Sequence, residues 1–142
     1  MHSSFTVFVW EWATHGGEQQ RAALAKVLLL DPDILLMDEP TKGLDAEFKQ
    51  VFAEIMQVLL RKGVTILMVS HDVEFCARYA HRCALFFDGN IVTQGSPRTF
   101  FSGNNFYTTS ANRMARAVAP EAVTPEDLIS VCGGELPPAP EL

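Results

Sequence analysis

The pattern of apolar and polar positions predicts that helices and strands alternate along this chain. Apolar residues recur at helical spacing over 18–30 and again over 45–61, where they form one stripe along a helix. The short, continuous apolar run 34–37 is bounded by turn residues, which is typical of a strand buried on both faces of a parallel sheet, and 64–70 is predicted to be the next buried strand. The stripe of the second helix consists of Phe48, Phe52, Ile55 and Leu59.

The second half of the chain carries shorter signals of the same kind. The predicted elements are a helix over 72–79, strands over 82–87 and 90–94, a helix over 98–101, and a helix start at Thr124. Asp88-Gly89 is a turn signal that joins the two strands into a hairpin. Together these elements predict an α/β fold: a mostly parallel sheet flanked by helices, followed by a C-terminal β-hairpin and a small helical tail.

Two carboxylates stand where the first predicted strand ends. Asp38 and Glu39 directly follow the apolar run, and ligands and metals in open α/β sheets gather at the carboxyl ends of the strands. An Asp at this place can hold Mg²⁺ through water, because Mg²⁺ keeps much of its hydration shell. A neighbouring Glu can orient an attacking water and take up its proton. A strand that ends in Asp-Glu is the Walker B arrangement.

Four short motifs follow one another at spacings similar to those of one family. They are Gly16-Gly17-Glu18-Gln19-Gln20-Arg21, the Asp38-Glu39 strand end, Gly43-Leu44-Asp45 and Ser70-His71-Asp72. As a set, over roughly residues 16–102, they resemble the ATP-binding cassette (ABC) ATPase family. The resemblance implies part of a P-loop NTPase fold, with ATP as the nucleotide and Mg²⁺ as its metal ion.

The resemblance also implies a role for each motif. Asp38 would hold Mg²⁺, Glu39 would be the general base, and His71 would be the switch histidine that contacts the γ-phosphate. Asp45 would belong to the D-loop at a dimer interface, although it is equally well placed as a plain helix N-cap. The signature motif would contact nucleotide bound to the opposing subunit, with a His where the family usually has Ser. Its residues are His15, Gly16, Gly17 and Glu18.

Composition narrows the classes of protein that remain. With 48% hydrophobic and 20% charged residues, the 142-residue chain is typical of a globular domain. Its net charge of −6 argues against a broad nucleic-acid surface, so no nucleic-acid partner is expected. No apolar stretch reaches the roughly 18–20 residues that span a bilayer. The three cysteines lack metal-ligand spacing and are expected to be thiols in a reducing compartment.

The chain is expected to divide into four stretches. Residues 1–15 are an aromatic-rich leader that is interpreted as foreign to the fold, the alternative being a real edge strand over Phe5–Trp10. The ABC-like segment spans 16–102, an accessory segment spans 103–132, and a tail rich in Gly, Pro and Glu spans 133–142.

One motif of the family is missing from the sequence. The 142 residues contain no G-x-x-x-x-G-K-[ST], and therefore no Lys-bearing nest for the β- and γ-phosphates. The chain is interpreted as the C-terminal part of an ABC ATPase domain that does not hydrolyse ATP alone. In isolation it is expected to bind Mg·ATP weakly, to be marginally stable, and to expose an apolar patch.

The residues after the hairpin bear on the branch of the family. Residues 106–116, with the downstream Thr-Pro-Glu-Asp, resemble the tail of energy-coupling factor (ECF) ATPases, which drive uptake of vitamins and transition-metal ions. This implies a second ABC ATPase domain and transmembrane subunits as partners, and a peripheral position at the cytoplasmic face of the cell membrane. Three alternatives stay open: an ordinary ABC importer ATPase, a non-hydrolysing module docked on a complete ATPase, and a soluble non-transport ABC protein.

Overall fold

The computed structural model describes residues 7–10, 25–26, 29–103 and 107–135. The chain forms two compact units, which divide between Asp72 and Val73. The four predicted stretches were drawn from motifs rather than from packing, and they stay predictions. The signature residues His15, Gly16, Gly17 and Glu18 lie outside the described residues, as does most of the helix predicted over 18–30.

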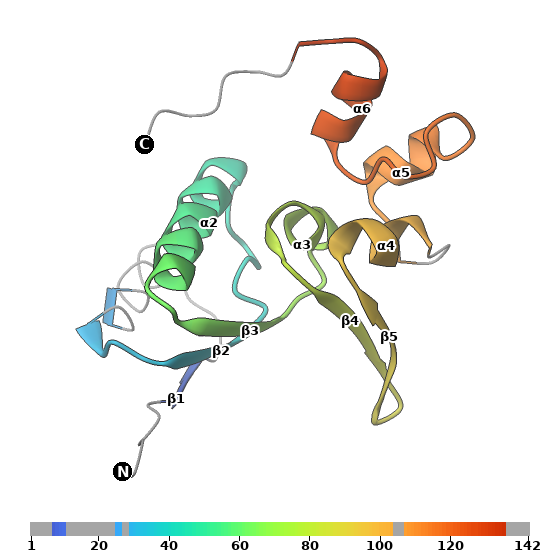
Figure 1. Cartoon of the computed structure of the whole chain (residues 1–142). Coiled ribbons are helices and arrows are strands. Elements are labelled where there is room, and N and C mark those ends of the chain that lie inside the picture. Colours follow the sequence, from blue (N-terminus) through green and yellow to red (C-terminus); the bar gives the residue numbers. More distant parts are fainter. Residues whose placement is uncertain (1–6, 11–24, 27–28, 104–106, 136–142) are drawn as a thin grey trace. The chain divides into compact units, whose positions relative to one another are not determined.

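The first unit is built around a parallel sheet of three strands in the order β1-β2-β3 (Figure 1). The strands are β1 (Val7–Trp10), β2 (Ile34–Asp38) and β3 (Thr65–Val69). β2 is the central strand, and it is parallel to both neighbours. β1 falls within the leader, where the alternative prediction expected an edge strand, and it pairs with β2 from Val7 to Trp10.

Helix α2 (Ala46–Arg61) connects β2 to β3 and lies on one face of this sheet (Figure 1). It begins as predicted, because the Oδ1 atom of Asp45 accepts a hydrogen bond from the Phe48 N–H at 2.7 Å. Ile55 lies at the border of its apolar arc and is half-buried, whereas Met56 faces inward. The buried residues of α2 are Phe52, Ala53, Met56 and Leu59.

The two faces of the sheet differ in how far their side chains are buried. Leu35 of β2 is 0% exposed, whereas Leu67 and Val69 of β3 are 62% and 61% exposed. Side chains alternate between the faces along a strand, so Leu67 shares a face with its register partner Leu36, and Leu35 points to the other face. The prediction that both strands are buried is therefore wrong for β3 in the described part of the chain. The expected exposed apolar patch is present there.

The second unit begins with α3 (Val73–Tyr79) and continues as an antiparallel hairpin of β4 (Cys83–Phe87) and β5 (Asn90–Gly95). Asp88 and Gly89 have φ values of 47° and 77°, and two successive positive φ values are what a type I′ hairpin turn requires. The predicted hairpin is therefore confirmed. Three short helices follow, namely α4 (Pro97–Ser102), α5 (Ser110–Ala115) and α6 (Pro125–Val131).

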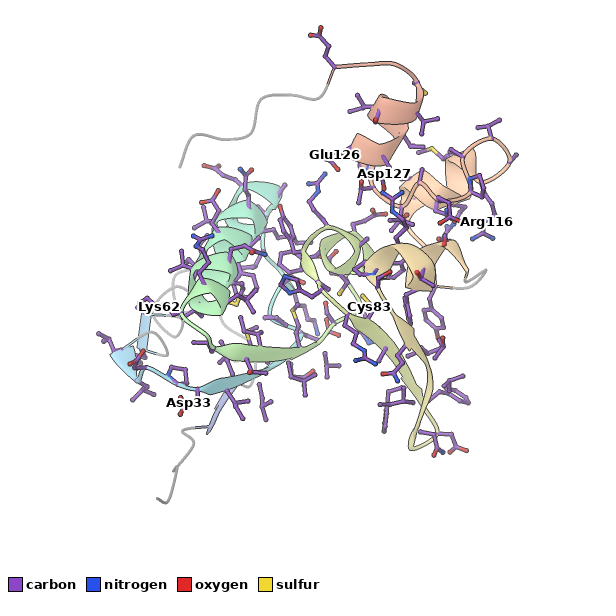
Figure 2. All side chains as sticks on the ribbon, in the orientation of Figure 1. Asp33, Lys62, Cys83, Arg116, Glu126 and Asp127 are labelled. Carbon is purple, nitrogen blue, oxygen red and sulfur yellow. The ribbon has the colours of Figure 1, made fainter. Side chains whose placement is uncertain are left out.

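The core of the second unit joins these short elements. Ala77, Phe101 and Val123 are buried together, and burial raises the pKa of the neighbouring Cys83 thiol. Helix α6 carries Glu126 and Asp127, which are marked in Figure 2. Glu126 pairs with Arg78 of α3, and Asp127 pairs with Arg98 of α4 at 2.8 Å. These ion pairs hold α6 to both earlier helices.

A helix that crosses a bilayer needs about 20 predominantly apolar residues. Among the described residues, no helix is both long and apolar enough to do so.

Candidate functional site

The carboxyl ends of β2 and β3 bring three of the predicted site residues to one edge of the sheet. Asp38 ends β2, and the N–H of Glu39 donates a hydrogen bond to the Val69 carbonyl of β3 at 2.8 Å. This bond extends the β2–β3 ladder by one residue, so Glu39 lies beside Val69, the last residue of β3. His71 follows Val69 by two residues. Asp33, which directly precedes β2 and is labelled in Figure 2, marks the opposite edge.

Glu39 and His71 are in contact. The His71 N–H donates to Oε2 of Glu39 at 3.3 Å, and the His71 Nε2 atom lies 3.6 Å from Oε1. The imidazole is 94% exposed, whereas the Glu39 side chain is only 22% exposed. Within the described residues, the buried Oε1 atom accepts no hydrogen bond. A buried acceptor without a hydrogen bond is a place for a water or ligand donor, and this one faces the predicted switch histidine.

The backbone of Glu39 is strained. Its φ is +46°, in the left-handed region that residues with a Cβ rarely adopt. Backbone strain of this kind costs on the order of 1–3 kcal/mol and gathers at functional sites. The tight turn that follows explains it locally, because the Lys42 N–H donates back to the Glu39 carbonyl at 3.1 Å. The chain thus turns away immediately after the strand and leaves the carboxylate at the sheet edge.

Asp38 is an exposed carboxylate at the end of β2. No group of three His, Cys, Asp or Glu side chains in the described part of the chain could hold a metal ion by itself. Mg²⁺ needs few protein ligands, because it keeps several waters and binds substrate phosphates. A single exposed carboxylate at this edge therefore fits Mg²⁺ bound mainly by water and nucleotide.

Asp45 has an observed structural role as the N-cap of α2. Its predicted place in a D-loop at a dimer interface stays a prediction. The turn that leads to it is well anchored, since Thr41 is 2% exposed and its carbonyl accepts a hydrogen bond from the Leu44 N–H at 3.3 Å. Asp45 is thus held at a fixed distance from Glu39 along a short, hydrogen-bonded segment.

Sequence reasoning missed one pair in this unit. The Lys49 Nζ atom lies 2.5 Å from Oδ2 of Asp72, with side chains that are 34% and 17% exposed. Lys49 stands one helical turn after Asp45, and Asp72 directly follows His71. The sequence shows a lysine one helical turn after Asp45, but only the fold shows that this lysine pairs with Asp72 of the Ser70-His71-Asp72 motif.

The second unit has a cavity of about 280 Å³. Helix α6 and the 118–122 loop line it together with Arg98. Its lining includes none of the predicted site residues, so the strand ends of the first unit stay the candidate site.

A parallel α/β unit with Asp-Glu at the end of one strand and His after the next is part of a P-loop NTPase fold. Solved structures agree with this class. The ATP-binding cassette MJ0796, in a dimeric post-hydrolysis state with ADP and Pi, is similar with a TM-score of 0.53 and 29% sequence identity. The similarity covers 59% of this chain and 36% of that one.

Sequence comparisons identify the family. A profile described as ABC transporter matches residues 14–42. An inferred ABC transporter ATP-binding protein of Bacillus cereus is 47% identical over 121 residues, which are 85% of this chain and 22% of that protein. The energy-coupling factor transporter ATP-binding protein EcfA2 of Mesomycoplasma hyopneumoniae is 38% identical over 91 residues, 64% of this chain and 30% of that protein.

The chain belongs to the ABC ATPase family. It spans only about a fifth of the length of the Bacillus cereus relative.

Proposed function

We propose that this chain supplies the Walker B and switch residues of an ATP-hydrolysing site in the motor subunit of an ABC transporter. The observation that carries the proposal is Glu39 at the carboxyl edge of a parallel sheet: its side chain is 22% exposed and contacts His71, and its backbone has a positive φ. A structural carboxylate would be expected to have its buried oxygens satisfied. The Oε1 atom of Glu39 accepts no hydrogen bond from the described residues.

The chemistry follows from these positions. Glu39 orients the attacking water and accepts its proton through Oε1, the oxygen that is not used by the His71 N–H. The exposed imidazole of His71 is able to turn toward the γ-phosphate and donate a hydrogen bond to it. Mg²⁺ near Asp38 would neutralise phosphate charge. Most of the rate enhancement would come from positioning and charge stabilisation.

The remaining parts of the site would come from outside these residues. A phosphate-binding loop is absent from the sequence, and the signature residues His15, Gly16, Gly17 and Glu18, with Asp45, would act on nucleotide held by a second ABC ATPase domain. The dimeric state of MJ0796 supports this arrangement. Transmembrane subunits at the cytoplasmic face of the membrane would complete the transporter. The EcfA2 similarity supports an ECF-type system, with an ordinary importer ATPase as the alternative.

The test is a graft. Residues 16–102 replace the matching segment of the Bacillus cereus relative, and phosphate release and ATP binding are measured beside the ungrafted parent. Glu39→Gln should lower kcat by roughly 10²–10⁴-fold with little change in ATP binding, because a general base acts in the transition state. Glu54→Gln, which changes a glutamate on α2, is the matched control and should keep normal turnover.

Two outcomes would contradict the proposal. Normal turnover of the Glu39→Gln graft would remove Glu39 from the reaction. A graft that binds but never hydrolyses ATP, beside an active parent, would favour the non-hydrolysing docking module. The chain alone should bind Mg·ATP only weakly, and a micromolar or tighter dissociation constant by calorimetry would contradict that expectation.

The transport part of the proposal has its own test. Affinity-tagged chain, expressed in Bacillus cells and purified from solubilised membranes, should bring integral membrane proteins with it. Recovery with ribosomes or nucleic acid instead would favour a soluble, non-transport ABC protein.

A further inference from the structure

Lys49 and Asp72 join two segments of the first unit that both carry predicted site residues. Lys49 lies on the first turns of α2, where its N–H donates to the carbonyl of the cap residue Asp45 at 3.0 Å. Its ammonium group lies 2.5 Å from the Asp72 carboxylate. The Asp72 side chain is 17% exposed, so this pair is screened less than a pair at the open surface.

The loop that carries His71 depends on such anchors. The Asp72 N–H donates to the Ser70 hydroxyl at 3.0 Å, and the His71 N–H donates to Glu39 at 3.3 Å. The imidazole is almost fully exposed, so its position follows from the backbone that carries it. With the Asp72 carboxylate tied to α2, the backbone of residue 71 is held against the strand end.

We propose that Lys49 is a positioning residue, which acts through Asp72 to hold His71 against the Glu39 carboxylate. The contacts form a closed chain from Glu39 through the 40–45 turn to α2, across the ion pair to Asp72, and back through His71. The inference rests on the proposed ATPase function. Lys49 touches neither Glu39 nor His71 by any contact of the described structure, so its effect would be on their geometry.

The first test uses the 142-residue chain without nucleotide. The His71 amide proton resonance, measured by NMR, should shift on Glu39→Gln because the hydrogen bond to a carboxylate is lost. In a Lys49→Met background this response should disappear, whereas Lys49→Arg should restore it because the charge and reach are kept. Lys62→Met, which removes an exposed lysine from the other end of α2, should leave the response at full size.

A response of full size in the Lys49→Met background would overturn the proposal. If Lys49→Met prevents folding, Asp72→Asn breaks the same ion pair with almost no change in shape and should abolish the response equally. An Asp72→Asn chain that keeps the response would likewise overturn it.

The second test separates positioning from a purely structural contact. In the graft, Lys49→Met should lower kcat roughly tenfold or more while the KM for ATP stays within about twofold, because only geometry in the transition state changes. Unchanged kcat would overturn the proposal even if the NMR response is lost. Normal turnover of Glu39→Gln would refute the proposed function instead, and the NMR result on Lys49 would be unaffected.

Discussion

The strand ends of the first unit and the Asn112 network of the second unit differ in how completely their polar groups are hydrogen-bonded. In the first, Glu39 has a positive φ, and its Oε1 atom accepts no hydrogen bond from the described residues. In the second, Asn112 is 0% exposed, and its amide donates to the carbonyls of Pro120 and Ala122 at 2.7 and 2.9 Å. Its oxygen accepts from Thr108 and Arg116.

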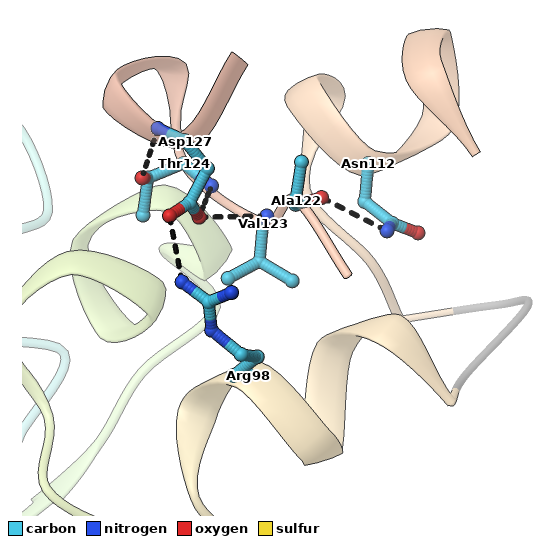
Figure 3. A network of polar contacts seen from close by, with 6 residues as sticks. All are labelled: Arg98, Asn112, Ala122, Val123, Thr124 and Asp127. Carbon is cyan, nitrogen blue, oxygen red and sulfur yellow. Dashed lines mark hydrogen bonds and ion pairs between the residues drawn. The ribbon is translucent and has the colours of Figure 1, made fainter. Parts of the chain in front are cut away.

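Figure 3 shows how the second network continues. Asp127 accepts hydrogen bonds from the N–H groups of Val123 and Thr124, both at 2.9 Å, and pairs with Arg98. Thr124 in turn accepts from the Asp127 N–H, which completes a capping box. A fully satisfied network stabilises one conformation, whereas a carboxylate with one unsatisfied oxygen on a strained backbone is typical of a functional site.

The largest effect is expected at Asn112. Asn112→Ala removes the donor to the Pro120 and Ala122 carbonyls and the acceptor of the Thr108 and Arg116 hydrogen bonds, so the second unit should lose about 3 kcal/mol of stability. Urea unfolding followed by residue-resolved hydrogen exchange would measure it, with Arg113→Ala, an exposed neighbour, as the control. A loss below about 1 kcal/mol would show that the network is dispensable.

His71→Ala should lower turnover and leave stability unchanged, the reverse of what is expected for Asn112→Ala. The side chain is 94% exposed, so stability should be unchanged, whereas kcat of the graft should fall by roughly 10- to 100-fold, equivalent to about 1.4–2.7 kcal/mol. His81→Ala is the matched control, since His81 is exposed and has no motif around it. A fall in melting temperature with unchanged kcat would contradict a role in the reaction.

Asp127→Ala removes the N3 carboxylate of the capping box and the partner of Arg98. We expect a loss of about 1–2 kcal/mol from the second unit, in the range measured for helix caps. Thermal melts of the 142-residue chain should show this loss. A similar loss in Glu121→Ala, an exposed loop residue, would indicate a general effect of charge rather than of the cap.

Glu39→Asn should stabilise the first unit of the chain and abolish turnover of the graft. Asn tolerates positive φ better than Glu, so relief of strain should raise stability by about 0.5–1 kcal/mol. Asp88→Asn, at a φ of 47° in the hairpin turn, should give a similar gain with no functional loss. A destabilised Glu39→Asn chain would mean that the carboxylate is structural.

The smallest effect is expected on the stability of the second unit as the pH is lowered. Burial opposes ionisation of Asp127 and Glu126, but hydrogen bonds to Asp127 from Val123 and Thr124, and to Glu126 from Arg78, outweigh it and lower both pKa values. A lowered folded-state pKa contributes stability above the unfolded pKa, which is about 4 for these groups, and this is lost as pH falls through the folded value. Melts from pH 6 to pH 3 should show the second unit weakening below about pH 4, less so in Asp127→Ala.

The individual elements were largely predictable from the sequence. The capped helix at Asp45, the Asp88-Gly89 hairpin and the helix start at Thr124 depend on contacts within a few residues, and local patterns report such contacts directly. The carboxylates at the end of β2 were predictable for the same reason, because a buried strand and its last residues are contiguous in the chain.

Contacts between distant segments were not predictable. The ion pair of Lys49 with Asp72 joins residues 23 positions apart, and the contact of Glu39 with His71 joins residues 32 apart. The exposure of Leu67 and Val69 likewise depends on which face of the sheet α2 covers. The sequence by itself determined the local elements and the residue types of the site. Only the tertiary structure decided which of them meet, because strand pairing and helix packing bring together side chains that no local period relates.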